Sequence, residues 1–110
     1  MTKLYLSAPY MGKENQEVKE NIERAIIAAA KLRDRGFNVF LPHGNFVYCL
    51  DLQNNFESRK KIYQLCNEWI EVCDVIAFMP GWKRSDGCCS EFKEACRFHK
   101  KIMYLTVNDL

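Results

Sequence analysis

Short apolar runs alternate along this chain with stretches of helical periodicity, and the alternation limits the folds that it can adopt. Apolar residues at helical spacing predict helices, and short apolar runs closed by turn-forming residues predict buried strands. In chain order, the sequence predicts a strand at 4–6, a helix at 14–35, a strand at 38–41, a helix at 58–73, a strand at 75–79, a helix from about 87 to 100 and a strand at 102–105. Gly36 is a natural stop for the first helix, and residues 43–57 are expected to form a long polar loop.

Strands separated by helices are joined by right-handed crossovers, which give a parallel sheet covered on both faces. We therefore predict a single α/β domain over residues 1–110, a flavodoxin- or Rossmann-like three-layer sandwich with about four strands in the order 2-1-3-4. In such a sheet a crevice opens where the strand order reverses, at the carboxyl ends of strands 1 and 3. Residues 7–12 and 80–91 occupy those two ends.

Each predicted helix should bury one face against the sheet. The residues expected to face inward are Val18, Ile22, Ala25, Ile26, Ala29 and Leu32 in the first helix, Ile62, Cys66, Trp69 and Cys73 in the second, and Cys88, Phe92, Ala95, Cys96 and His99 in the third.

Composition excludes several classes of function. The chain has 110 residues and a net charge of +2, too small to indicate a nucleic-acid surface. It lacks an apolar run of membrane-spanning length and an N-terminal signal peptide, so we expect a cytoplasmic protein without a membrane partner. The six cysteines form no Cys-x-x-Cys pair. Reduced core thiols are the expected state, a metal site is the alternative, and no cofactor is indicated.

Glu91 is the residue expected to carry chemistry. It lies near the start of the third helix, where unpaired backbone N–H groups and the helix dipole would favour an ionised carboxylate. An ionised and fixed carboxylate beside a ligand can attack an electrophilic carbon, for which glycosyl centres are the commonest targets. The alternative is an ordinary acidic preference at a helix start.

The loop before Glu91 supplies possible ligand contacts. Trp82 could stack on a flat ring or fold back on the core, and Arg84 and Ser85 could hold a phosphate or a sugar hydroxyl. Gly87 would allow a ligand to approach the backbone, while Asp86 could contact the ligand or cap the helix.

The first strand and the segment after the second strand could also reach the crevice. Ser7 and Tyr10 directly follow the first strand. Tyr5 lies inside that strand and is expected in the core, although its hydroxyl could reach the crevice. His43, after the second strand, could border the ligand or simply be a satisfied loop histidine.

Three segments together resemble the nucleoside 2-deoxyribosyltransferase superfamily: 4–9 (LYLSAP), 39–42 (VFLP) and 73–79 (CDVIAFM). The most specific feature is a glycine four residues before a helix-start glutamate, here Gly87 and Glu91. The chain also resembles a compact branch described as domains of unknown function and related to nucleoside monophosphate N-glycosidases.

The resemblance implies cleavage or transfer at the N-glycosidic bond of a small nucleoside or nucleoside monophosphate. In the family a glutamate at the Glu91 position attacks the anomeric carbon, and serine and arginine side chains hold the phosphate, for which Ser7, Arg84 and Ser85 are candidates. Family members are homo-oligomers, so a homodimer or higher homo-oligomer is expected, with Asn108 of a neighbouring copy completing each site.

One position departs from the family pattern. Cys66 stands where the family usually places an aspartate that contacts or protonates the base. Either another acid assists, such as Asp86 or a residue of the 43–57 loop, or the activity is altered or lost. The alternatives are a non-catalytic module that binds a nucleotide-like ligand and a protein-interaction domain with a vestigial site.

Overall fold

The computed structural model describes residues 1–10, 14–46 and 56–110. Its strands are β1 (Lys3–Ser7), β2 (Asn38–Phe40), β3 (Val75–Phe78) and β4 (Lys101–Tyr104), which form a parallel sheet in the order β2-β1-β3-β4. The predicted fold class and strand order are confirmed.

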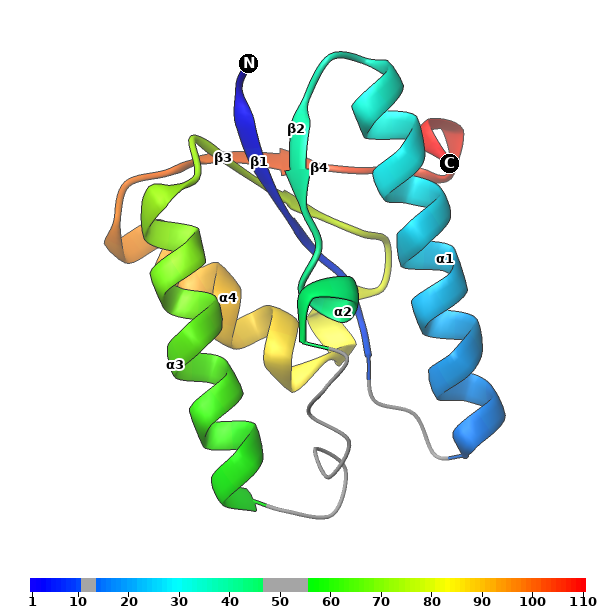
Figure 1. Cartoon of the computed structure of the whole chain (residues 1–110), viewed down its shortest axis with the longest axis vertical. Helices are drawn as coiled ribbons and strands as arrows, with labels where there is room; N and C mark the ends of the chain where they lie inside the picture. Colours follow the sequence, from blue (N-terminus) through cyan, green and yellow to red (C-terminus); the bar gives the residue numbers. More distant parts are fainter. Residues whose placement is uncertain (11–13, 47–55) are drawn as a thin grey trace.

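The helices cover the two faces of this sheet. They are α1 (Asn15–Asp34), α2 (Pro42–Asn45), α3 (Phe56–Val72) and α4 (Asp86–Arg97), with 3-10 turns η1 (Trp82–Arg84) and η2 (Val107–Asp109). Figure 1 shows α1 on one side of the sheet and α3 and α4 on the other. The β1-to-β2 connection runs in one direction across the sheet and the β2-to-β3 and β3-to-β4 connections run in the opposite direction, so right-handed crossovers place their helices on opposite faces.

Side-chain alternation along the strands divides the core in two. Leu4 and Leu6 pack with α1, whereas Tyr5 packs with α3 and α4. The same alternation in β3 directs Ile76 and Phe78 towards α3 and α4. β1 therefore presents Tyr5 and Ser7, two residues apart, to the face that carries α4.

Some residues predicted to face inward do not. Ile26 is 52% exposed because the buried stripe of α1 runs through Val18, Asn21, Ala25, Ala28 and Leu32, which places residue 26 at its side. Asn21 is buried instead, and its side-chain amide donates to the Tyr10 carbonyl at 3.2 Å.

Similar corrections apply to the other two helices. Cys96 is exposed because the buried stripe of α4 runs through Cys88 and Ala95, which places residue 96 at its side. His99 is exposed because α4 ends at Arg97 and His99 adopts a left-handed conformation with φ of 54°. Trp69 is 42% exposed, although its ring stacks on Phe40 with the centroids 4.3 Å apart.

The predicted loop at 43–57 is only partly described. It opens with the short helix α2, which has Pro42 in its first turn. Residues 47–55 lie outside the described structure. Gly36 does end α1, with φ of 97°. Within the described residues, each helix is too short or too polar to cross a membrane.

Candidate functional site

The carboxylate of Glu91 is held by two hydroxyl groups of β1. The Tyr5 hydroxyl donates to Glu91 Oε2, and Ser7 Oγ donates to Oε1 at 2.8 Å. Tyr5 and Ser7 are both 0% exposed, whereas the Glu91 side chain retains partial exposure. Because these residues are two apart in a strand, their side chains reach the same helix, and each can orient one carboxylate oxygen.

Glu91 is not in the first turn of its helix. α4 begins at Asp86 with Ser85 as its N-cap, so Glu91 is the sixth helical residue. The unpaired N–H groups of a helix belong to its first four residues, and the dipole effect falls off within the first turn. The prediction that the helix start stabilises the ionised carboxylate was therefore wrong; the hydroxyl groups of β1 do so.

Burial nevertheless dominates the acidity of Glu91. Desolvation, opposed only in part by the hydrogen bonds from Tyr5 and Ser7, raises the pKa of Glu91 from 4.5 to about 7. Both protonation states are therefore populated near neutral pH. Burial, followed by the nearby charge of Glu91, raises the pKa of Tyr5 well above its ordinary value, so Tyr5 remains a hydrogen-bond donor.

Two cysteines surround this arrangement. Burial raises the pKa of the Cys88 thiol to about 11, and that thiol is hydrogen-bonded to Ser7 and Ser85. The Cys66 thiol is hydrogen-bonded to the Tyr5 hydroxyl. Cys66, Cys73, Cys88, Cys89 and Cys96 are free thiols, and no group of three metal-ligating side chains occurs among the described residues.

The structure distinguishes between the roles predicted for residues of the loop before α4. Ser85 Oγ accepts from the Cys88 backbone N–H at 3.3 Å, so Ser85 caps the helix and Asp86, exposed at the first helical position, does not. Trp82 stacks on Phe92 with the centroids 4.9 Å apart, which favours the packing interpretation over ligand stacking.

The remaining predicted contacts are more scattered. Arg84 is exposed and folds back towards Gly81, where a Cβ would lie 3.3 Å from Arg84 Nη2. His43 Nε2 is 3.0 Å from the Pro9 carbonyl, and its ring meets Tyr10 edge-on at 5.3 Å. Burial lowers the pKa of His43, which favours a neutral imidazole that ties α2 to the end of β1.

Asn108 lies in η2, and this turn is anchored near the end of α1. Arg35 pairs with Asp109 at 3.5 Å, and Lys31 donates to the Leu110 carbonyl. The contribution of Asn108 from a neighbouring copy stays a prediction.

Two residues near Glu91 were missed as site residues. Cys88 precedes Glu91 by three positions, so it lies on the same face of α4. Tyr63 on α3 packs beside Gly87, where a Cβ would lie 3.8 Å from the Tyr63 ring and its hydroxyl. Helical spacing from Cys66 could have indicated Tyr63, because residues three apart share a face.

The chain matches a known family over most of its length. Residues 2–104 match the family described as Domain of unknown function (DUF4406). The chain is a member of the DUF4406 family. No curated protein matches this DUF4406 member.

Among solved structures, the DUF4406 chain is similar to a 2-deoxyribosyltransferase from Bacillus psychrosaccharolyticus. The TM-score is 0.66 and the identity 23%, and the match covers 94% of this chain and 71% of that enzyme. The resemblance to nucleoside 2-deoxyribosyltransferases is therefore confirmed for the fold.

Proposed function

We propose that this protein cleaves or transfers at the N-glycosidic bond of a small nucleoside or nucleoside monophosphate, with Glu91 as the nucleophile. The observation that carries the proposal is the Glu91 carboxylate, oriented by Tyr5 and Ser7 at the end of β1. Its pKa of about 7 leaves a substantial ionised fraction at neutral pH. The shared fold with a 2-deoxyribosyltransferase supports the substrate class.

The proposed chemical step is a nucleophilic substitution at the anomeric carbon. A Glu91 oxygen attacks the anomeric carbon, and the C–N bond breaks with its electron pair moving to the base nitrogen. The product is a glycosyl ester of Glu91 and a released base. Water then restores the carboxylate and free sugar, or a second base restores the carboxylate and a new nucleoside. Tyr5 and Ser7 hold the carboxylate in place, which reduces the orientational cost of attack.

Substrate contacts outside the carboxylate are assigned to the α4 start. The exposed Arg84 guanidinium and the Ser85 hydroxyl, which also caps α4, are the proposed contacts to a phosphate or a sugar hydroxyl, with Gly87 beside them. A homo-oligomer in which Asn108 of another copy reaches this site remains part of the proposal, as does a cytoplasmic location.

The test measures base release by chromatography from a panel of deoxynucleosides, ribonucleosides and their monophosphates. Wild type should release base, and Glu91→Gln should lose at least about 10³-fold in rate because an amide is not a nucleophile here. Glu68→Gln, at an exposed position of α3, is the matched control and should retain the rate. Equal release by Glu91→Gln and wild type, or no release from any substrate, would contradict the proposal.

The second candidate function is non-catalytic binding of a nucleotide-like ligand at the same place. The observation that favours it is Cys66, whose thiol is hydrogen-bonded to Tyr5 in place of a carboxylic acid. Calorimetric titration with the same panel separates the two functions. Saturable binding without base release supports a binding module, and any turnover abolished by Glu91→Gln excludes it.

A further inference from the structure

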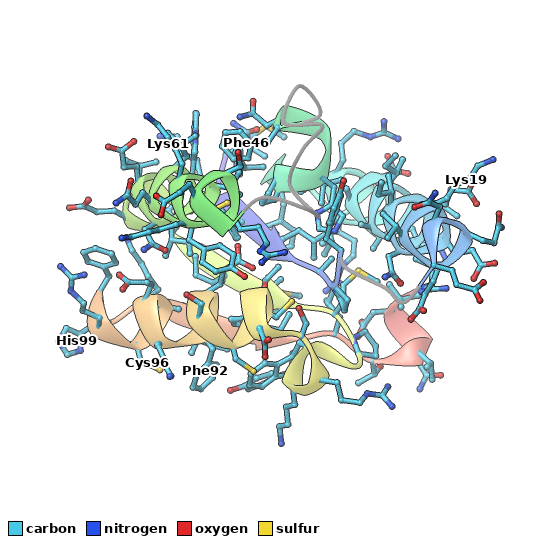
Figure 2. All side chains as sticks on the ribbon, turned by 90° about the horizontal axis from the view of Figure 1, so that it is seen from below. Lys19, Phe46, Lys61, Phe92, Cys96 and His99 are labelled. Carbon is cyan, nitrogen blue, oxygen red and sulfur yellow. The ribbon has the colours of Figure 1, made fainter. Side chains whose placement is uncertain are left out.

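Tyr63 lies beside Glu91 although the two belong to different helices. α3 and α4 pack side by side (Figure 2). A Cβ on Gly87 would lie 3.8 Å from the Tyr63 hydroxyl and 3.9 Å from Ser85 Oγ. Gly87 precedes Glu91 by four residues, so both lie on the face of α4 that meets Tyr63. The phenol therefore lies one helical turn from the proposed nucleophile.

Breaking an N-glycosidic bond requires more than a nucleophile. The departing base carries the electron pair of the broken bond, and it leaves as an anion unless a proton or a strong hydrogen bond reaches it. A proton donor for this purpose must keep its proton in the resting protein and must stand within reach of the ligand beside the nucleophile.

The other groups around Glu91 meet these conditions poorly. The Tyr5 and Ser7 hydroxyls donate to Glu91 itself. The Cys66 thiol is bonded to Tyr5, and the Cys88 thiol to Ser7 and Ser85. Asp86 is exposed at the first position of α4, about one and a half turns from Glu91 along the helix. Tyr63 is partly exposed and carries its hydroxyl next to Gly87.

We propose that Tyr63 is a catalytic residue that gives its phenolic proton to the leaving base while Glu91 attacks the anomeric carbon. This inference rests on the proposed function. The C–N electron pair goes to the base nitrogen, the phenolic proton neutralises that nitrogen, and Glu91 becomes a glycosyl ester. The tyrosinate recovers its proton from water, which also supplies the hydroxide that hydrolyses the ester, or from the incoming base in the transfer reaction.

The charges around Tyr63 favour this sequence of events. Desolvation raises the pKa of Tyr63, the Asp86 and Glu91 carboxylates raise it further, and Arg59 opposes them. The phenol therefore holds its proton in the resting protein. When Glu91 becomes a neutral ester, one of the two negative charges that raise the pKa of Tyr63 disappears. The phenol then loses its proton more readily, at the step that needs it.

The experiment compares leaving groups that need a proton with one that does not. Base release by wild type and Tyr63→Phe is measured for deoxyadenosine and deoxyguanosine, or for their monophosphates if wild type prefers them, and for the N7-methylated deoxyguanosine counterpart, whose base departs neutral. Tyr63→Phe should lower kcat about 10²-fold on the ordinary substrates and by no more than a few-fold on the methylated one.

Tyr104→Phe is the matched control, because Tyr104 stacks against Trp82 in the aromatic cluster and should tolerate the loss of its hydroxyl at full activity. Thermal melting checks that Tyr63→Phe, which retains the ring beside Gly87, stays folded. Equal losses on ordinary and methylated substrates, or no loss on either, would overturn the role of Tyr63 while leaving Glu91 as nucleophile. Failure of wild type to release base from every substrate would instead overturn the proposed function.

Discussion

Tyr5→Phe tests the electrostatic description of the site most directly. The substitution removes one hydroxyl and leaves the buried ring in the core formed by β1, β3, α3 and α4. The bond from Tyr5 is the first of the two that hold the pKa of Glu91 down against burial, so its loss should raise that pKa above about 7. Ser7→Ala removes the second bond and should produce a smaller increase.

The size of the shift follows from the strength of the bond. A hydrogen bond to a charged group contributes about 1.5–3 kcal/mol, and one pKa unit corresponds to about 1.4 kcal/mol. The pKa of Glu91 should therefore rise by about 1–2 units in Tyr5→Phe. At pH 7 the ionised fraction would fall from about one half to between about 1% and 10%.

The pKa can be measured without any substrate. A ¹³C NMR titration of the glutamate side-chain carboxyls between pH 4 and 10 follows each group, and Glu91→Gln identifies the Glu91 resonance. Tyr104→Phe serves as the control and should leave the Glu91 midpoint unchanged. A Glu91 midpoint that stays the same or falls in Tyr5→Phe would refute the account of how β1 controls the carboxylate.

Two further outcomes concern stability. The pKa of Glu91 is about 7 in the folded protein and is expected near the ordinary 4.5 in the unfolded chain, so folding takes up a proton between these two pH values. The free energy of unfolding is therefore greatest below this window and falls as the pH rises through it. Glu91→Gln should therefore have a higher melting temperature than wild type at pH 8, corresponding to up to about 3 kcal/mol of unfolding free energy, and should differ little at pH 4.5. A wild type that melts higher than Glu91→Gln at pH 8 would contradict this. Ser85→Ala removes the α4 cap and should lower the unfolding free energy by about 1 kcal/mol in urea titrations, whereas Ser90→Ala inside the helix should not; equal effects would deny the cap.

The fold was predictable because its strands are short apolar runs separated by long amphipathic helices. Right-handed crossovers then restrict the strand order, and β1 and β3 meet at the centre of the sheet as expected. The helix faces were less predictable. Periodicity alone does not fix which residues centre the buried stripe, and on α1 the polar Asn21 takes a core position while Ile26 faces outward.

The site was predictable in its members more than in its chemistry. Alternation along β1 could place Tyr5 and Ser7 on one face, and the motif could place Glu91 near them. The protonation state required three-dimensional information, because the desolvation that dominates the pKa of Glu91 comes from residues distant in sequence. The first residue of α4 also had to come from the structure. Because Ser85 caps this helix, Glu91 lies beyond the residues whose backbone N–H groups are unpaired.

A pKa of about 7 is compatible with a nucleophilic role for Glu91 and even favours one. At neutral pH only about half of the molecules carry the carboxylate, which lowers the rate by a factor of about two, or about 0.4 kcal/mol. The ionised carboxylate is, however, destabilised by about 3 kcal/mol relative to an ordinary one, the net effect of burial and the two hydrogen bonds, since its pKa rises from 4.5 to about 7. Formation of a neutral glycosyl ester relieves that destabilisation, so the environment of Glu91 favours attack by more than it lowers the ionised fraction. The hydrogen bonds from Tyr5 and Ser7 determine the ionised fraction of Glu91, because without them the carboxyl group would remain protonated at neutral pH.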